Sequence, residues 1–174
     1  MTLTPPPTSR IRLRPYRTED APLVEKMFAD DLARRFYPDM DQPEPARNWI
    51  RANLDRYELE GFGLWAIERV STGEFLGDCG LTIQSVDESP LLEVGYHLLS
   101  AHRGHGYATE AGRACIEFAF RHTNTPLVCS IVDPENSQSI AVASRLHSFR
   151  RTANRRGRTM LLFWTDREAA EPEW

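Results

Sequence analysis

Polar and hydrophobic residues alternate near the start of the chain. Ile11 and Leu13 lie between Arg10, Arg12 and Arg14. A period of two is typical of a strand with one buried face. We therefore predict a first strand over residues 10–15.

Two helices are predicted to follow this strand. Thr18 can cap a helix whose first turn carries two acidic residues, where negative charge suits the helix dipole. We expect that helix to continue to about Phe36. Apolar side chains then recur at helical spacing from about Pro45 to Tyr57, and the glycines at residues 61–63 would end this second helix.

Three strand-like segments come next. Residues 64–69 and 74–83 are separated by a short turn at residues 71–73, which favours an antiparallel hairpin. A second turn at residues 87–90 leads into the third segment, residues 91–99. These segments predict three consecutive antiparallel strands.

The second half of the chain predicts a parallel pair of strands joined by a helix. Residues 109–121 show an amphipathic helical pattern, and residues 127–132 resemble a buried strand. A strand, helix and strand in this order give a parallel crossover. A further helix is expected over residues 138–147, and a final hairpin over residues 149–153 and 158–164.

This order of elements predicts the fold class. Antiparallel strands followed by one parallel crossover indicate an α+β protein with a mixed, mostly antiparallel central sheet flanked by helices. We find no internal repeat. We predict a flexible leader at residues 1–8, a single domain at residues 9–166 and a C-terminal tail at residues 167–174.

Composition narrows the classes of function. A chain of 174 residues is long enough for one domain with a core of its own. The net charge of −4 and the pI of about 5.8 argue against a general nucleic-acid binder, which usually carries a basic excess. Small molecules or peptides are therefore the expected substrates, with no nucleic-acid partner.

Targeting signals and metal ligands are not evident. The proline-rich start lacks a basic segment followed by an apolar one, and no apolar run approaches the ~20 residues that span a bilayer. We expect a cytoplasmic protein with no membrane partner. Cys79, Cys115 and Cys129 form no metal-binding pattern, so we expect buried free thiols and no metal.

The segment at residues 103–108 (RGHGYA) joins a predicted strand to a predicted helix. Its two glycines allow a tight turn and a close approach of the backbone to a ligand, and a helix start favours anions. The sequence is consistent with a phosphate-binding loop or with a plain connector. Thr109 stands where a dinucleotide-binding loop has its third glycine, and no Gly-x4-Gly-Lys-Ser/Thr motif is present, which disfavours a nucleotide-binding enzyme.

Four blocks of sequence resemble one known family. They are residues 93–96 (EVGY), 104–111 (GHGYATEA), 117–120 (EFAF) and 132–137 (VDPENS), the last with Ser139. Together with the element order, they resemble the GNAT superfamily of acetyl-CoA-dependent N-acetyltransferases, and in particular the branch that acetylates ribosomal-protein N-termini. The resemblance covers nearly the whole chain and implies the acyl-CoA N-acyltransferase (GNAT) fold.

The resemblance also implies how acetyl-CoA would bind. Backbone N–H groups of residues 103–108 would hold the pyrophosphate, and the pantetheine arm would lie beside the fourth strand where it splays from the fifth. Asn136 would contact the pantetheine, although it could equally serve as a helix cap. The expected binding residues are Tyr96, His97, Leu98, Arg103, Gly104, His105, Gly106, Tyr107, Ala108, Thr109, Asn136 and Ser139.

Acetyl transfer to an amine requires a proton acceptor, because only a neutral amine attacks the thioester. Glu93 is the candidate base, acting through a water, although a glutamate in a strand can be merely solvated. A backbone N–H at Tyr96 or His97 would hold the oxyanion. Many family members protonate the departing thiolate with a tyrosine, but that position holds Ala143 here, which leaves Ser144 or Ser139 as weak substitutes.

Other polar residues near the implied site allow more than one interpretation. His97 could shuttle protons or be an ordinary strand residue. The arginines that begin at Arg150 could clamp an anion or form a solvated hairpin tip. The chain has Leu146-His147-Ser148-Phe149 where the family tends to have Leu-Gly-Phe. The family pattern therefore does not predict the helix end or the pocket wall beside it. The arginines concerned are Arg150, Arg151, Arg155, Arg156 and Arg158.

These inferences lead to a functional hypothesis. We expect an N-acetyltransferase that moves an acetyl group from acetyl-CoA to a primary amine, by direct attack in a ternary complex. The acceptor would be a protein or peptide N-terminus or a small molecule, and the acidic residues Asp39, Asp41 and Glu44 favour a cationic one. The alternative is a non-catalytic acyl-CoA sensor. Whether the chain forms a homodimer is left open.

Overall fold

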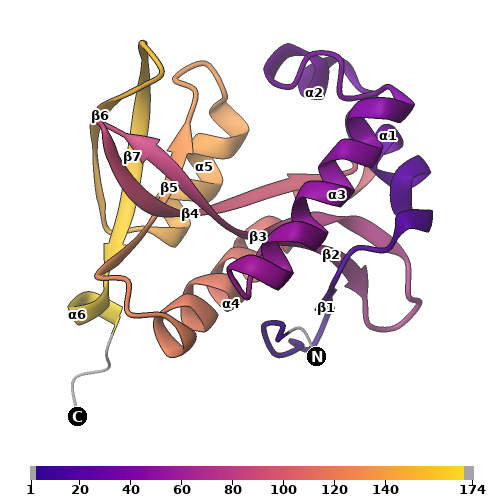
Figure 1. Cartoon of the computed structure of the whole chain (residues 1–174), viewed down its shortest axis with the longest axis horizontal. Coiled ribbons are helices and arrows are strands. Elements are labelled where there is room, and N and C mark those ends of the chain that lie inside the picture. The colour runs from indigo at the N-terminus through magenta and orange to yellow at the C-terminus, as the bar shows by residue number, and fades with distance from the viewer. Residues whose placement is uncertain (1–2, 171–174) are drawn as a thin grey trace.

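The computed structural model describes residues 3–170 and contains one seven-stranded sheet (Figure 1). The strand order is β1-β2-β3-β4-β5-β7-β6, and all pairs are antiparallel except β4 with β5. The predicted mixed sheet and α+β class are confirmed. The strands are β1 Ile11–Arg14, β2 Leu64–Arg69, β3 Phe75–Val86, β4 Ser89–Leu98, β5 Leu127–Val132, β6 Phe149–Arg155 and β7 Arg158–Asp166.

Helices cover both faces of the sheet. α4 packs on one face of β3 and β4, while α1 and α3 pack on the other face, as Figure 1 shows. Two short 3₁₀ turns, η1 and η2, precede α1 and α4. The helical elements are η1 Thr18–Asp20, α1 Ala21–Met27, α2 Asp31–Phe36, α3 Pro43–Leu59, η2 Ser100–His102, α4 Tyr107–His122, α5 Ser137–Leu146 and α6 Arg167–Ala170.

The predicted continuous helix from Thr18 to Phe36 was wrong. The structure contains η1 and two separate helices, α1 and α2, in this region. The chain breaks because the Asp30 side chain accepts hydrogen bonds from the N–H groups of Leu32 and Ala33, which starts a new helix. α2 thereby becomes an independent element that can line a cleft.

Both ends of the described chain make specific contacts. Thr8 and Arg10 bond the carboxylate of Glu110 in the first turn of α4. Arg167 donates to main-chain carbonyls in the last turn of α4 and in the segment between α4 and β5. Residues 167–170 of the predicted tail form α6, and residues 1–2 and 171–174 lie outside the described residues.

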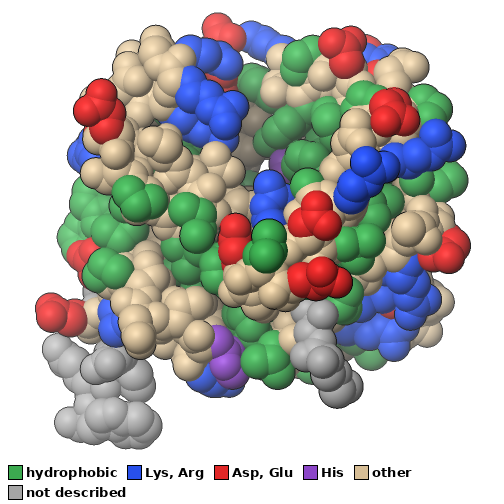
Figure 2. Space-filling view, in the orientation of Figure 1, with side chains coloured by type: hydrophobic (Ala, Val, Ile, Leu, Met, Phe, Trp, Pro, Cys, Tyr) green, Lys and Arg blue, Asp and Glu red, His purple; other side chains and the backbone are tan. Residues whose placement is uncertain are grey.

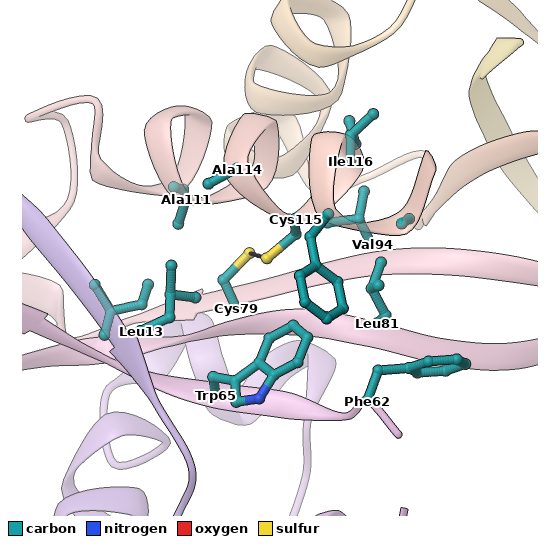
Figure 3. Packing of buried hydrophobic residues seen from close by; sticks show 14 of the residues in the cluster. Leu13, Phe62, Trp65, Cys79, Leu81, Val94, Ala111, Ala114, Cys115 and Ile116 are labelled. Atoms are coloured by element: carbon teal, nitrogen blue, oxygen red, sulfur yellow. Dashed lines mark hydrogen bonds between the residues drawn. The ribbon is translucent and has the colours of Figure 1, made fainter. Parts of the chain in front are cut away.

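The core between the sheet and α4 contains two cysteines close together. The Sγ atoms of Cys79 and Cys115 lie 3.6 Å apart (Figure 3), well beyond the ~2.05 Å of a disulfide. Burial raises the pKa of the Cys79 thiol well above its ordinary value, so this thiol stays protonated. With Cys129 also buried and free, the expectation of buried free thiols is confirmed.

His147 ends α5 inside the protein. Its Nε2 lies 3.0 Å from Oγ of Ser130, and its Nδ1 lies 3.0 Å from Oγ1 of Thr165. Ser130 in turn donates to the main-chain carbonyl of Val94 in β4. The imidazole therefore links α5 to β4, β5 and β7.

We predict that this histidine makes stability depend on pH. Burial lowers the pKa of His147 from 6.5 to about 4, so between these values the unfolded chain binds more protons. The contribution is complete above pH 6.5 and is lost as the pH falls toward 4. Between about pH 7 and about pH 4.5, the wild type should lose about 2 kcal/mol more free energy of unfolding than His147→Gln.

Urea denaturation of both proteins at the two pH values measures this difference. Carboxylates titrate in both proteins and cancel in the comparison. Equal losses would show that His147 is not held in its neutral form.

Candidate active site

The central feature of the site is the divergence of β4 from β5. These parallel strands are paired at a single position, Glu93 with Cys129. Beyond Glu93, β5 remains paired with β7 while the rest of β4 loses its neighbour on that side. The implied splay between the fourth and fifth strands is thus present in the structure.

A large cleft of about 1230 Å³ opens at this divergence. Figure 2 shows the face hollowed between α2 on one side and the α5 and hairpin region on the other. The cleft is bounded by β4, by the loop before α4, by α5, and by the α2 residues Leu32, Ala33 and Phe36. Its lining includes Tyr96, His97, Leu98, Arg103, Gly104, Gly106, Ala108, Thr109, Asn136 and Ser139.

Ten of the twelve residues expected to bind acetyl-CoA therefore share this cleft. His105 and Tyr107 do not line it: His105 Nδ1 bonds the carbonyl of Arg103, and the Tyr107 hydroxyl accepts from Arg69. Any contact that these two residues make with a cleft ligand must come from their main chain.

The loop before α4 has the geometry of an anion site. Gly104 and Gly106 adopt φ of +79° and +82°, a region that side-chain-bearing residues disfavour. Gly106 is the N-cap of α4, whose first N–H groups have no partner within the helix. Aligned main-chain donors and the positive end of a 16-residue helix therefore meet at the edge of the large cleft.

Arg103 connects this loop to the opposite wall. Its guanidinium bonds both carboxylate oxygens of Asp30 at 2.8 and 2.7 Å, and this partner holds the pKa of Asp30 below its ordinary value. Asp30 also caps α2. Its carboxylate therefore fixes α2 against the glycine loop, so anion binding there depends on the main chain.

The far wall of the cleft is set by the start of α5. Asn136 caps that helix by accepting from the N–H of Ser139 at 3.1 Å, so the cap interpretation of Asn136 is confirmed. The Tyr96 hydroxyl reaches across the splay and donates to the Ser139 carbonyl at 3.1 Å. This bond joins β4 to α5 where the strands have separated.

A smaller cleft of about 240 Å³ meets the large one, and four residues line both. Glu93, Gly95 and His97 lie on one face of β4 and form part of its wall, because alternate strand residues share a face. The other side chains that line it include Arg56, Thr82, Gln84 and Arg155. The shared residues are Tyr37, Tyr96, His97 and Ser139.

Glu93 is held within the smaller cleft by weak polar contacts. Its carboxylate accepts from the Ile131 N–H and the Thr82 hydroxyl, each at 3.3 Å. Burial raises the pKa of Glu93 above its ordinary value, and the positive charge of Arg155 opposes part of that rise. A carboxylate in such surroundings is a better proton acceptor than an exposed one.

His97 stands where the two clefts meet. Its Nδ1 lies 2.7 Å from Oδ1 of Asp78, a fully buried carboxylate on β3. Gly77 allows the strands to approach at this point, since a Cβ there would lie 2.0 Å from the His97 carbonyl oxygen. The sequence interpretation missed Asp78, although a lone acid within a buried apolar strand signals a polar partner.

The remaining predicted side chains divide between the clefts and the surface. Ser144 is exposed on α5 and lines neither cleft, so it lies away from the other site residues. Ala143 is fully buried. Of the five hairpin arginines, Arg155 lines the smaller cleft and the other four are exposed.

Two further properties concern the described residues only. Within residues 3–170, no group of three or more His, Cys, Asp or Glu side chains is arranged to hold a metal ion. No helix in that range has the length and apolar character needed to cross a membrane.

Comparison with known proteins gives this cleft a context. Residues 10–148 match the family model described as an acetyltransferase (GNAT) domain. YkkB of Bacillus subtilis (strain 168), an uncharacterized protein, is 35% identical over 140 residues, which cover 80% of this chain and 81% of YkkB. An uncharacterized N-acetyltransferase, p20 of Bacillus licheniformis, is 30% identical over 80% of this chain and 79% of its own.

Solved structures agree with the fold. The acetyltransferase from Agrobacterium tumefaciens str. C58 superposes with a TM-score of 0.81 at 27% identity over 95% of both chains. RimL, a ribosomal L7/L12 alpha-N-protein acetyltransferase solved in complex with coenzyme A, superposes with a TM-score of 0.74 at 16% identity, over 95% of this chain and 98% of its own. A family model that spans most of the chain, supported by the same fold, shows that the protein belongs to the GNAT family of acetyltransferases.

Proposed function

We propose that the protein transfers an acetyl group from acetyl-CoA to a primary amine. The observation that carries this proposal is the junction of two clefts along β4. One cleft begins at a glycine-rich helix start suited to a pyrophosphate, and the other contains a desolvated carboxylate suited to an amine. The coenzyme A complex of RimL supports assigning the large cleft to the acyl donor.

The unpaired edge of β4 would hold the pantetheine arm. An extended amide-containing chain can pair with a free strand edge as an added strand does. The N–H groups of residues 103–108 would bind the pyrophosphate, and the free amide nitrogen of Asn136 would contact the pantetheine. In this arrangement the thioester reaches the residues shared by both clefts.

Glu93 would accept the first proton of the acceptor ammonium through a water. The neutral amine then attacks the thioester carbon in a ternary complex, and a main-chain N–H at Tyr96 or His97 would stabilise the oxyanion. The C–N bond forms first, and collapse of the tetrahedral intermediate then breaks the C–S bond. Coenzyme A and the acetylated amine are the products.

The smaller cleft limits the acceptor. A volume of about 240 Å³ suits a small amine or the first residue of a peptide rather than a large rigid molecule. Arg56 and Arg155 line this cleft, while Asp41 of the acidic loop pairs with Arg34 at 2.8 Å. The two arginines in the cleft and the paired Asp41 therefore weaken the expectation of a cationic acceptor that the acidic loop gave.

Turnover separates this function from an acyl-CoA sensor of the same fold. Thiol release from acetyl-CoA should be measured with peptides of varied N-terminal residue and with small amines. We expect acceptor-dependent release and an acetylated product by mass spectrometry. Tight binding of coenzyme A without release for any acceptor would instead indicate the sensor.

The glycine loop provides a prediction about the donor. Gly104→Ala should weaken coenzyme A binding about tenfold, because a methyl group would obstruct close approach to the loop N–H groups. Gly73→Ala is the matched control, since Gly73 has φ +72° against +79° at Gly104 and neither has an atom within 4 Å of an added Cβ.

Both substitutions should lower the free energy of unfolding by about 1 kcal/mol through backbone strain. Calorimetric titration with coenzyme A should then distinguish them. Equal affinities for the two variants would remove the loop from the donor site.

Gly95 provides a prediction about the acceptor. An added Cβ would meet only Leu64 Cδ2, at 3.7 Å, so Gly95→Ala should fold normally. The methyl group narrows the smaller cleft, and we expect the acceptor KM to rise about tenfold while coenzyme A affinity stays unchanged. Steady-state kinetics and calorimetry test this, and an unchanged KM would place the acceptor elsewhere.

Glu93→Gln should lower kcat about 100-fold while coenzyme A still binds. The raised pKa of Glu93 means that wild-type activity should fall, as pH decreases, at a higher pH than for an ordinary glutamate. The variant should lose this acid limb of the pH profile. Glu88→Gln makes the same chemical change at an exposed turn and should behave as wild type.

A further inference from the structure

The proposed reaction leaves one proton transfer without a group to perform it. After a neutral amine attacks, its nitrogen carries one surplus proton, and the departing sulfur needs one. Many relatives assign the second task to a tyrosine, but Ala143 is buried at that position and Ser144 is exposed outside both clefts. A different group must lie between the acceptor nitrogen and the sulfur.

His97 lies at that location. It is the one histidine that lines both clefts within the described residues. Its Nδ1 is bonded to Asp78, and its Nε2 has no hydrogen-bond partner among residues 3–170 and is not a buried unsatisfied atom. The lone pair or proton on Nε2 is therefore presented to open space.

Asp78 has surroundings that suit this function. It is fully buried, and its second oxygen accepts from the Tyr16 hydroxyl at 2.7 Å and the Trp49 indole N–H at 2.9 Å. Within the described part of the chain, no arginine or lysine pairs with it, and its one ionisable cationic partner is His97. A carboxylate bonded to Nδ1 stabilises the positive charge that the imidazole carries while it holds a second proton during the reaction.

Packing fixes the orientation of the ring. The aromatic rings of Phe28, Tyr37 and Trp49 have centroids 5.4, 4.8 and 5.3 Å from that of His97, and all three meet it at steep angles. The bond to Asp78 selects the tautomer with the proton on Nδ1. The neutral ring therefore offers Nε2 as a proton acceptor without reorganisation.

We propose that His97, positioned by Asp78, carries the proton from the acceptor nitrogen to the coenzyme A sulfur. This rests on the proposed acetyl transfer and extends it. Nε2 takes the surplus proton from the nitrogen of the tetrahedral intermediate. As the C–S bond breaks, the same proton passes from Nε2 to the thiolate, and the neutral imidazole is restored.

The titratable groups around the imidazole come from several elements. Asp78 lies on β3, Glu93 lies farther along β4, and Tyr37 follows α2. Burial raises the pKa of Tyr37 above its ordinary value, so it stays neutral across the working range. The charged groups around His97 are therefore the carboxylates of Asp78 and Glu93 and the guanidinium groups of Arg56 and Arg155, which line the smaller cleft.

Kinetics provide the first test. With the best amine from the acceptor panel, His97→Gln should lower kcat by about 100-fold and leave the KM for acetyl-CoA within a few fold. Asp78→Asn should also lower kcat and shift its pH dependence, because the amide cannot stabilise a charged imidazole. Both proteins must first show a wild-type circular dichroism spectrum and coenzyme A affinity.

Tyr16→Phe is the matched control for Asp78→Asn. It removes another hydrogen bond to the same carboxylate and lines neither cleft. It should cost about 1 kcal/mol of stability and leave the pH dependence of kcat as in the wild type. A purely structural function of the network predicts that Tyr16→Phe and Asp78→Asn shift the profile alike.

A second test needs no acceptor. Coenzyme A bound to the wild type should form its thiolate at a lower pH than coenzyme A bound to His97→Gln, because Nε2 of the neutral imidazole can accept the thiol proton and a glutamine side chain cannot. Ultraviolet difference absorbance against the complex with desulfo-coenzyme A measures this ionisation.

Each outcome distinguishes the two proposals. Equal thiol ionisation in both complexes, or an unchanged kcat in His97→Gln, overturns the assignment of His97 but leaves acetyl transfer intact. Failure of the wild type to bind coenzyme A overturns the proposed function itself.

Discussion

The site depends on two parallel strands that stop pairing. β4 and β5 share one paired position, and beyond it β4 presents an unpaired edge inside the protein rather than at the rim of the sheet. Unpaired main-chain groups in such a place are costly unless a ligand or solvent satisfies them. The divergence therefore creates the cleft and leaves main-chain groups along it that solvent or an occupant with amide groups can satisfy.

Polar contacts hold the parts of the protein on either side of the β4–β5 divergence in place. Tyr96 bonds Ser139 across the gap, and His147 joins Ser130 and Thr165 below it. On the open side, the Asp30 carboxylate bonds Arg103 of the glycine loop. Because apolar packing has little directionality, these bonds are what set the separation of the walls.

The parts of the fold that were predicted correctly depend on patterns among residues close together in the sequence. Strand alternation, turn glycines and the crossover helix identified the mixed sheet and the glycine loop. The break in the first helix was missed because Asp30 is also compatible with a continuing helix, and its capping bonds became visible only in three dimensions. Likewise, the position of Ser144 in the sequence does not show which way its side chain faces. Only the three-dimensional structure shows that Ser144 lines neither cleft.

Contacts between distant strands were beyond the reach of sequence patterns. Asp78 and His97 are 19 residues apart, and they meet because β3 and β4 pair in register at these two positions. Register depends on the whole hairpin, including a glycine at position 77 that permits close approach. A lone acid in an apolar strand indicates that a partner exists, but the sequence does not identify it.

Two ionisable groups of β4, Glu93 and His97, have different environments on one face of the strand. Glu93 accepts from neutral donors and is influenced by the positive charge of Arg155, whereas His97 is bound to a buried carboxylate. Gly95 stands between them and leaves room for a reacting group. Titratable groups whose surroundings differ in this way can take opposite parts in proton transfer. One strand can therefore provide a proton acceptor at the amine and a proton carrier at the sulfur without a contribution from α5.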